Sequence, residues 1–474
     1  MKLFTPVKVA TAAITLILSG SALSGGLTPA QLQKFGQGAE TDVIVILRDQ
    51  MPGVPAVRGG LEARASALAA AQVPLQAELR QAAATRVHNF QLINALSARV
   101  SKAEISRLAA HPLVAAVVPD RVFHAIKPNA ANGAASGGAS AAVASTSDGG
   151  LCNTLEPQAL ELLHAAYADT SRPQAQRVRD GNGQFVTGKG VKVAFIADGI
   201  DPTVAGFTRP DGTPVFFDYQ DFSGDPAGTP TDGGEAFGDA STLAAQDNPD
   251  GTPLIYDISQ FVNATHPLPS PCNIRIRGIA PGASLAGLKV FSELGLTTES
   301  TFVQAIEYAV LNDHVDIINE SFGGEPLPDN STDPTSLAND AAVQAGVTVV
   351  VSSGDAGTYG TIEEPSTDPF VIAAGASTAY RFYAQTGSGV IPLLSKPLEV
   401  SNNISPLSSG GFSQQHARTI DVVAPGDLGW ALCSTNTALF IDCVSYAGTA
   451  TPIESFGGTS ESSPLTAGTA ALVI

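Results

Sequence analysis

The sequence contains, near its end, the stretch Phe456-Gly457-Gly458-Thr459-Ser460-Glu461-Ser462-Ser463-Pro464, and an Ala-rich apolar run follows it over 465–473. The two glycines permit a sharp turn, and the apolar run predicts a buried helix. A serine at the start of a helix lies where backbone N–H groups and the helix dipole stabilise negative charge. That position suits a nucleophile whose reaction develops an oxyanion. On this stretch alone the simpler interpretation is that Ser460 caps the helix, so the rest of the chain must decide.

The composition describes a globular chain with room for two or three domains. It has 474 residues, of which 44% are hydrophobic and 15% charged, so it can bury a large core. The 25 basic residues are outnumbered by 44 acidic ones, which gives a net charge of −19. This balance argues against nucleic acid or an anionic membrane surface as a partner.

The N-terminus has the pattern of a secretion signal. Lys2 and Lys8 precede the apolar run 9–18, and small residues follow as far as Ser24. This predicts a signal peptide over 1–24, because the run is too short to span a bilayer comfortably. We therefore expect a secreted protein in a compartment that permits disulfides, with no membrane partner.

The four cysteines are too few for a disulfide scaffold. They allow three connectivities. One pairs Cys433 with Cys443 in a short loop and leaves Cys152 and Cys272 as the second pair, and we prefer it without excluding the others. No cysteine or histidine spacing indicates a zinc site, and no cofactor is expected.

Residues 40–125 form the first globular segment. Strands are predicted over 43–47, 90–100 and 113–122, with helices over 61–85 and 102–110, the second capped by Ser101. This order predicts a small α+β domain. Residues 126–150 are rich in Ala, Gly and Ser, which predicts a flexible linker open to proteases. A small domain and a cleavable linker behind a signal peptide suggest a pro-segment.

From residue 151 onward, helical periodicity alternates with continuous apolar strands. This predicts an α/β fold, with a parallel sheet covered by helices on both faces. Functional sites in such folds lie at the carboxyl ends of the strands. Asp198, Ser321, Asp355 and Ser460 are expected there or at a helix start that faces those ends.

Several stretches in this region resemble, in order, motifs of the subtilisin-like serine peptidases. They are Gly-Val-Lys-Val-Ala-Phe-Ile-Ala-Asp-Gly-Ile-Asp (190–201), Gly-Ile-Ala-Pro-Gly-Ala (278–283), Val-Asp-Ile-Ile-Asn-Glu-Ser-Phe-Gly-Gly (315–324), Val-Val-Ser-Ser-Gly-Asp (350–355), Asp-Val-Val-Ala-Pro-Gly (421–426) and Gly-Thr-Ser (458–460).

The resemblance implies a subtilisin-like peptidase domain over 151–474, with polypeptide substrates and Ser460 as nucleophile. It assigns Ser321, Gly323 and Gly324 to substrate binding, with the two glycines pairing with substrate backbone. Segment 40–125 is similar to the family's inhibitory propeptide, which implies a ferredoxin-like pro-domain that acts as an intramolecular inhibitor of a zymogen.

The sequence departs from the subtilisin pattern at two catalytic positions. Ala197 stands where the family has its aspartate, and Asp198 follows one residue later, where a strand-end side chain turns to the other face. The family's histidine motif is absent. The nearest similar stretch ends in His266. It would put Asn263 at the histidine position, and the proline that directly follows His266 does not suit a helix.

A second resemblance fills the gap. The stretch Gly-Glu-Ala-Phe-Gly-Asp-Ala-Ser-Thr-Leu-Ala-Ala (234–245) is similar to the family's histidine helix, with Glu235 at the histidine position and Asp239 one turn later. Glu235, Asp239, Asp355 and Ser460 together resemble the sedolisins, the serine-carboxyl relatives of subtilisin. The resemblance implies that Glu235 is the base, that Asp239 supports it and that Asp355 lies in the oxyanion hole.

Three hypotheses follow for residues 151–474. The first is an acid-active serine-carboxyl endopeptidase. The second is a subtilisin-like peptidase with Asp198 and a non-standard base such as His266, and the third is an inactive relative that serves as a binding module. A structural calcium site is compatible with the resemblance but is not assigned to any residue. Since the sequence stops inside the helix that begins near Ser460, we expect a C-terminally truncated domain.

Overall fold

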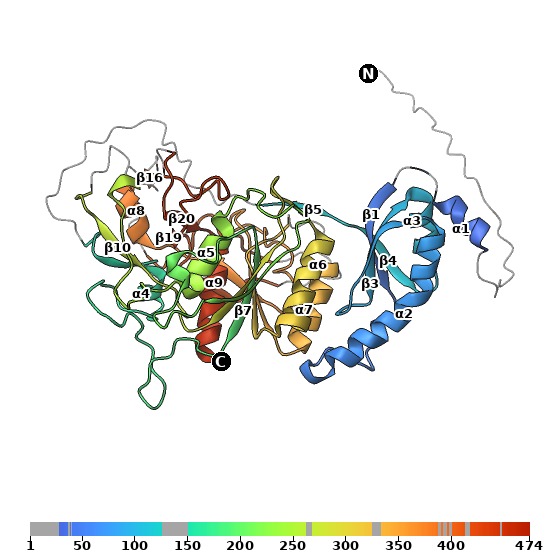
Figure 1. Cartoon of the computed structure of the whole chain (residues 1–474), viewed down its shortest axis with the longest axis horizontal. Helices are drawn as coiled ribbons and strands as arrows, with labels where there is room; N and C mark the ends of the chain where they lie inside the picture. The colour runs from blue at the N-terminus through green and yellow to red at the C-terminus, as the bar shows by residue number, and fades with distance from the viewer. Residues whose placement is uncertain are drawn as a thin grey trace, which may run out of the picture.

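The computed structural model describes residues 28–36, 38, 40–125, 150–261, 268–324, 333–386, 390–391, 396–397, 401–412, 418–445 and 448–474. The predicted signal peptide and nearly all of the predicted linker lie outside these ranges. Figure 1 shows a small N-terminal domain beside a large one. No helix in the described ranges combines the length and apolarity that crossing a membrane requires.

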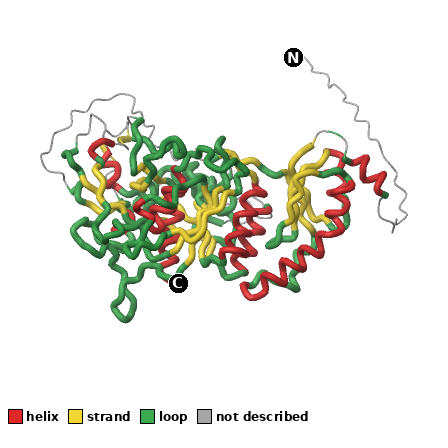
Figure 2. The backbone as a smooth tube through the Cα atoms, in the orientation of Figure 1, coloured by secondary structure: helices red, strands yellow, loops and turns green. Residues whose placement is uncertain are grey.

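A seven-stranded sheet forms the centre of the large domain, and all its neighbouring strands run parallel. Its order is β18-β15-β14-β13-β7-β11-β8. Figure 2 shows these strands gathered between helices. Their bounds are β7 Lys192–Ala197, β8 Phe216–Asp221, β11 Ser284–Lys289, β13 Ile317–Glu320, β14 Thr348–Ser352, β15 Ile372–Ala376 and β18 Val422–Ala424.

Helices cover both faces of this sheet, which confirms the predicted architecture. Successive side chains of a strand point to opposite faces, so Phe195 and Ile196 enter two different cores. The core containing Phe195 is closed by α5 (Gly234–Ala244) and α9 (Thr459–Val473). The other is closed by α6 (Glu299–Tyr308) and α7 (Pro334–Gln344).

Shorter elements complete the large domain. Its remaining helices and strands are β6 Thr154–Glu156, α4 Ala159–Leu162, β9 Ile255–Asp257, β10 Asn273–Ile276, β12 Leu296–Thr298, α8 Tyr380–Thr386, β16 Val390–Ile391, β17 Lys396–Pro397, β19 Leu428–Leu432 and β20 Ile453–Gly457, with single helical turns at Ala205–Phe207, Ser259–Phe261 and Ala309–Asp313. Strand β20 pairs with β19 and leads directly into α9. Disulfides join Cys152 to Cys272 and Cys433 to Cys443, which is the pairing preferred from the sequence.

The N-terminal domain is an α+β unit with the ferredoxin-like order β2-β3-β1-β4. Its sheet is antiparallel, with α2 and α3 in the connections. Its elements are α1 Pro29–Phe35, β1 Glu40–Leu47, a helical turn at Arg58–Gly60, α2 Leu61–Gln81, β2 Thr85–Asn89, β3 Ala95–Ser101, α3 Lys102–Ala109 and β4 Val114–Pro119. The side chain of Ser101 caps α3, as predicted.

The prediction of one strand over 90–100 was right for residues 95–100, which lie in β3, and wrong for residues 90–94. That region contains the end of a hairpin, in which residues 90–94 turn between β2 and β3. The buried apolar residues Phe90, Leu92 and Ile93 imitate a strand, but they belong to a core shared with the large domain. A single-domain interpretation of the pattern therefore mistook a docking turn for a strand.

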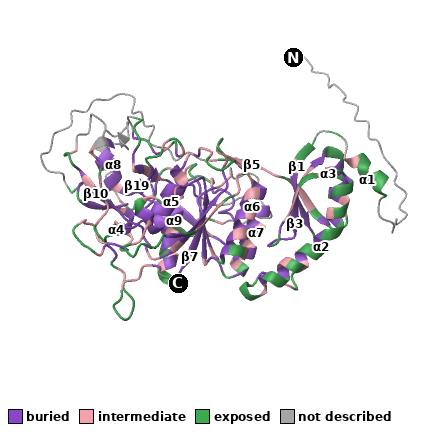
Figure 3. Cartoon of the chain, viewed as in Figure 1, coloured by how far each residue is buried: buried purple, intermediate pink, exposed green. Residues whose placement is uncertain are grey.

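The two domains share this core, which lies between the N-terminal sheet and the helices α6 and α7. Ile44 and Ile46 of β1 pack in the same cluster as Phe302 and Ile306 of α6. Figure 3 shows buried residues on both sides of the contact. A carboxylate oxygen of Glu307 accepts the backbone N–H groups of Gln91 and Leu92, the second at 2.8 Å, so the turn is fixed to α6 by polar bonds as well.

The N-terminal domain ends in an extended segment, residues 120–125, here called the tail. It contains β5 (Val122–His124), which pairs antiparallel with β12 of the large domain. The predicted last strand over 113–122 is thus divided between β4 and the tail. Figure 1 shows β5 crossing from one domain to the other.

A buried carboxyl behind the sheet predicts a pH-dependent stability. Glu320 at the end of β13 is fully buried, and burial raises its pKa to about 8, although a hydrogen bond from the Asn339 amide at 2.9 Å opposes the shift. A carboxyl with a raised native pKa stabilises the fold below its unfolded pKa, and this contribution is lost as the pH rises through the native value.

We therefore expect the melting temperature of the Ser460→Ala chain to fall between pH 5 and pH 9, with Glu320 contributing a loss on the order of 2–4 kcal/mol. Glu320→Gln should flatten the profile, because an amide does not ionise. Thermal scans at a series of pH values measure this, with the exposed Glu62 as a control in Glu62→Gln. An unchanged profile in Glu320→Gln would contradict the prediction.

Candidate active site

Ser460 lies at the start of α9, half-buried, where the backbone turns out of β20. The turn depends on Gly458, whose φ of 95° favours glycine. A Cβ there would lie only 2.3 Å from Oδ2 of Asp355. The predicted glycine turn and buried helix are therefore present, and they leave Asp355 directly beside the helix start.

Ser321 connects Ser460 to the neighbouring strand. Pro464 lacks the N–H that would bond to the Ser460 carbonyl in a regular helix. The Ser321 hydroxyl lies 3.1 Å from that carbonyl oxygen, and the Ser460 hydroxyl lies 3.4 Å from the carbonyl oxygen of Ser321. These two contacts hold the start of α9 against the end of β13.

Glu235 and Asp239 lie one turn apart on α5, and this helix start is held by Asp198. The two carboxylate oxygens of Asp198 accept the backbone N–H groups of Gly233 and Ala236 at 2.5 and 2.8 Å. Asp198 thus supplies the cap that Gly233, which has no side chain, lacks. The capping residue comes from the end of β7, far from the helix in sequence.

Both carboxyl groups on α5 have strongly raised pKa values. For Glu235, burial raises the pKa well above its ordinary value, the charges of Asp239 and Asp198 add to the shift, and a hydrogen bond with the Ser460 hydroxyl opposes it. For Asp239, which has no exposed surface, burial again raises the pKa most, and a hydrogen bond with Ser321 opposes the shift. Two such neighbours titrate as a pair and do not both ionise easily.

The bonds around Ser321 indicate where a proton resides. Its oxygen lies 2.7 Å from Oδ1 of Asp239 and 3.1 Å from the Ser460 carbonyl, and the amide of Asn319 donates to it at 2.9 Å. A hydroxyl has one hydrogen to donate and two lone pairs. All three contacts are satisfied when Asp239 is protonated and donates to Ser321, because Ser321 can then donate to the carbonyl. When the pair holds a single proton, this pattern of hydrogen bonds favours its location on Asp239.

Asp355 lies on the other side of the Ser460 turn and is exposed to solvent. Burial raises its pKa, while the backbone N–H and hydroxyl of Thr459 oppose the shift by donating to Oδ1 at 2.8 and 2.9 Å. Because Oδ1 already receives these donors, a proton on Asp355 belongs on Oδ2. A protonated Asp355 then presents an O–H donor beside Ser460.

Asp198 lines a pocket together with Glu235 and Ser321, but its carboxylate is used to cap α5. Burial raises its pKa to about 7 against those two backbone bonds. Ala197, at the family's aspartate position, is buried in the core. His266 lies outside the described residues, so the structure does not place the alternative base.

Glu454 is a further carboxyl that the sequence analysis missed. It lies on β20, and burial and then the charges of Asp198, Asp442 and Glu235 raise its pKa well above the ordinary value. Its only sequence signal is an acidic residue inside the apolar strand that precedes Gly458. With it, the carboxyls near Ser460 form an acidic cluster rather than an isolated pair.

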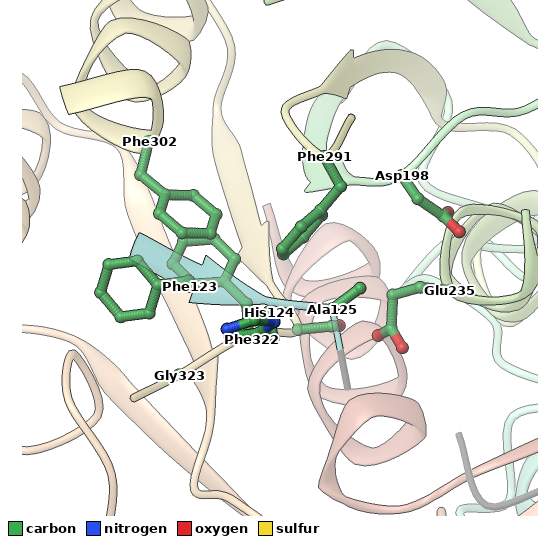
Figure 4. A pocket seen from close by; sticks show the side chains of 10 residues that line it. Phe123, His124, Ala125, Asp198, Glu235, Phe291, Phe302, Phe322 and Gly323 are labelled. Atoms are coloured by element: carbon green, nitrogen blue, oxygen red, sulfur yellow. The ribbon is translucent and has the colours of Figure 1, made fainter. Parts of the chain in front are cut away.

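The tail occupies the pocket in front of these groups. Figure 4 shows it passing the rings of Phe302 and Phe291 and bringing Ala125 beside Glu235. The N–H of Ala125 donates to the carbonyl of Gly295 at 2.7 Å, which continues the pairing of β5 with β12. A cavity of about 20 Å³ remains, roughly the space of one water molecule. The tail therefore fills this part of the cleft.

The predicted substrate-binding residues surround the tail. Ser321 and Gly323 line the pocket, and a Cβ on Gly324 would lie 2.8 Å from the ring of Phe123. The N–H of Gly324 bonds to the carbonyl of Glu364 at 2.9 Å. Backbone pairing with the tail comes from Leu296–Thr298, which the sequence analysis did not identify.

Among the described residues, one group of three candidate metal ligands comes together: Cys433, Cys443 and Glu454. The two cysteines are joined to each other, so their sulfurs are not thiolate ligands. This group does not fit a metal site.

Comparison with known proteins gives a family match for each of the two domains. Residues 188–474 match the Subtilase family, and residues 60–125 match Peptidase inhibitor I9. A solved structure described as a cold adapted subtilisin-like serine proteinase is similar with a TM-score of 0.39 and 19% identity, over 63% of this chain and 80% of that chain.

Curated relatives match over parts of their length. The minor extracellular protease Vpr of Bacillus subtilis (strain 168) is 31% identical over 40% of this chain and 21% of its own length. Subtilisin DY of Bacillus licheniformis is 31% identical over 42% of this chain and 57% of its own length. Serine protease AprX of Bacillus subtilis (strain 168) is 26% identical over 62% and 59%. The chain therefore spans well under two thirds of these relatives.

The match to the family covers more than half of the sequence and includes the segments that carry Asp198, Ser321, Asp355 and Ser460. The protein belongs to the subtilase family of serine peptidases.

Proposed function

We propose that the chain is the precursor of a secreted serine endopeptidase that works at acidic pH through a serine-carboxyl mechanism. Ser460 is the nucleophile, Glu235 the general base and Asp239 its supporting carboxyl, and Asp355 donates to the oxyanion. The observation that carries this proposal is the Ser321 hydroxyl, which contacts both the Ser460 carbonyl and Asp239, the carboxyl one turn from the partly buried Glu235.

In the acylation step the Ser460 oxygen attacks the peptide carbonyl carbon while its proton passes to Glu235. The C–N bond then breaks, and Glu235 returns that proton to the leaving amine. Hydrolysis of the acyl-enzyme repeats the sequence with water. Asp239 keeps its own proton and stays neutral, so it favours the ionised form of Glu235 without adding a second negative charge.

The developing oxyanion is stabilised by groups at the helix start. The N-terminal N–H groups and dipole of α9 favour negative charge there, and the O–H of Asp355 adds a directed donor. A carboxyl group can only serve in this way while it is protonated. The residue Asp355 is exposed, but partial desolvation of its carboxyl group raises its pKa, which favours the protonated form.

The pKa directions fix the sign of the pH dependence. Glu235 must be ionised, whereas Asp239 and Asp355 must be protonated, and burial raises all three pKa values. Activity should fall as the pH is lowered and the Glu235–Asp239 pair takes up a second proton. It should fall again toward neutral and alkaline pH as Asp355 and the pair lose their protons.

The N-terminal domain acts in this proposal as an inhibitory pro-domain. Its tail binds in the cleft as an antiparallel strand, with Ala125 reaching the pocket that Glu235 and Ser321 line. The Ala/Gly/Ser-rich segment after the tail is where the chain would be cut. The signal sequence over 1–24 directs the precursor out of the cell.

Two alternatives lead to different observations. A subtilisin-like mechanism would use Asp198 to orient a histidine, and it would require activity near neutral pH. The backbone bonds of Asp198 to α5 favour a capping role instead. An inactive relative would show no hydrolysis at any pH after correct removal of its pro-domain.

One prediction of this mechanism concerns the general base, Glu235. Glu235→Gln and Ser460→Ala should each lower kcat/KM for a peptide substrate by at least about 10³-fold, since each removes a group that moves in the reaction. The assay is peptide hydrolysis from pH 3 to pH 9 after removal of the pro-domain. The exposed Glu293 provides the control Glu293→Gln, which should keep the parental profile. Neutral activity that is indifferent to Glu235→Gln would refute the serine-carboxyl mechanism.

The second prediction concerns the oxyanion donor. Asp355→Ala should lower kcat by about 10²–10³-fold, because it removes the donor. Asp355→Asn should keep much of the acid activity and extend it to higher pH, since an amide N–H does not ionise while its oxygen can still accept from Thr459. The full pH profile of kcat for both variants tests this, and an Asp355→Asn enzyme as inactive as Asp355→Ala would contradict the assignment.

A further inference from the structure

Arg121 of the tail lies in an acidic pocket of the peptidase domain formed by Glu299, Asp333 and Glu364. Its Nε and Nη2 donate to the two oxygens of Glu299 at 2.9 and 3.0 Å, and Nη1 donates to Glu364 at 2.8 Å. Nη2 also lies 3.9 Å from Asp333. One guanidinium group thus contacts three carboxyl groups, two of them by direct hydrogen bonds.

The peptidase domain itself holds these carboxyl groups in place. Glu299 is the first residue of α6, with a side chain only 1% exposed. Asp333 caps α7 by accepting the N–H of Ser336 at 3.0 Å. The carbonyl of Glu364 accepts from Gly324, beneath Phe123. Asp333 and Glu364 are thus held by contacts within the peptidase domain. The N–H of Glu299 donates in addition to the Arg121 carbonyl of the tail, at 2.9 Å.

Arg121 balances the charge of this pocket. Burial raises the pKa of Glu299 to about 7, the Arg121 bond opposes that shift, and the charges of Asp333 and Glu364 reinforce it. Burial alone would lower the pKa of Arg121, but its bonds to Glu299 and Glu364 raise it overall. Departure of the tail therefore leaves three neighbouring carboxyl groups that have lost this cation.

The tail also shows where an arginine would lie along a bound peptide. In a strand, residues two apart lie on the same face, and Arg121 and Phe123 are two apart, with the guanidinium 5.4 Å from the ring centre. Phe123 packs edge-on against Phe302 at 5.4 Å between ring centres. The strand then continues through Ala125 to the catalytic pocket. Arginine thus precedes an aromatic residue, and both precede the bond to be cut.

We propose that, after the pro-domain leaves, the acidic pocket is a specificity subsite for arginine two residues before an aromatic residue, on the N-terminal side of the scissile bond. This inference rests on the proposed peptidase function. The preferred substrates are peptides with an Arg-x-Phe type segment in extended conformation. Lysine is a poorer match, because the paired bonds to Glu299 require the planar fork of a guanidinium group.

The test compares three peptides based on the tail and the residues that follow it, Asp-Arg-Val-Phe-His-Ala-Ile-Lys (120–127), extended by a reporter group. They carry Arg, Lys or Gln at the position of Arg121. We expect the processed enzyme to prefer Arg over Gln by about 10–100-fold in kcat/KM, in line with charge-assisted bonds of about 1.5–3 kcal/mol, and to place Lys between them.

Variants of the pocket identify the cause of the preference. Glu299→Gln and Glu364→Gln should each reduce the Arg/Gln ratio to within about threefold of unity, while the exposed Glu293→Gln keeps the parental ratio. Hydrolysis of all three peptides at equal rates, or a ratio that survives both pocket variants, overturns the subsite and leaves the proposed function standing. Failure to cut any peptide overturns the proposed function instead.

A binding measurement tests the same pocket without catalysis. In the full Ser460→Ala chain, a cleavage sequence for an unrelated protease is inserted within 126–149 and cut, and release of the pro-domain is then followed. Arg121→Gln and Glu299→Gln should each raise the dissociation constant by at least about tenfold, whereas Arg80→Gln on the exposed side of α2 should not. Equal retention in all variants overturns the arginine pocket.

Discussion

The hydroxyl of Ser321 connects the two helices that carry the candidate catalytic groups. It contacts Asp239 of α5 and the Ser460 carbonyl at the start of α9, and Asn319 orients it from within the same strand. These contacts span the edge of the central sheet where three elements meet. All three hydrogen bonds can form together only when Asp239 is protonated. The arrangement of the site therefore depends on the protonation state of Asp239. A histidine base gains and loses its proton near neutral pH. A site built from carboxyl groups instead needs some of those groups to stay protonated, which requires raised pKa values.

Burial controls those protons, and the sheet provides the burial. Helices α5 and α9 close one face of the sheet, with Asp239 completely enclosed between them. On the opposite face, α6 and α7 pack between the central sheet and the N-terminal domain. That domain thus contacts the peptidase at two levels. Its sheet completes a hydrophobic core, and its tail enters the cleft along β12 and brings Arg121 to the acidic pocket.

The sequence predicted the features that depend on local patterns. Continuous apolar runs such as 347–351 indicated parallel strands, and the glycines before Ser460 indicated the turn that the structure contains. The spacing of Glu235 and Asp239 placed them on one helical face. Features that depend on distant contacts were missed or misjudged. The segment 90–94 was predicted as strand because it contains apolar residues, but these residues are apolar because the large domain buries Phe90, Leu92 and Ile93. Asp198 gains its capping role only when β7 meets α5, and neither Glu454 nor Arg121 has a local signal for its surroundings.

The shared core also means that one polypeptide has to present two different surfaces to water. While the N-terminal domain is attached, Phe302, Ile306 and their neighbours on α6 are interior residues. Its removal, as proposed above, would turn their outer sides into surface, and an apolar face of this kind promotes contact between molecules. The chain carries a net charge of −19, and like charges keep molecules apart. If the N-terminal domain is removed as proposed, an excess of acidic residues would therefore oppose self-association through the uncovered face.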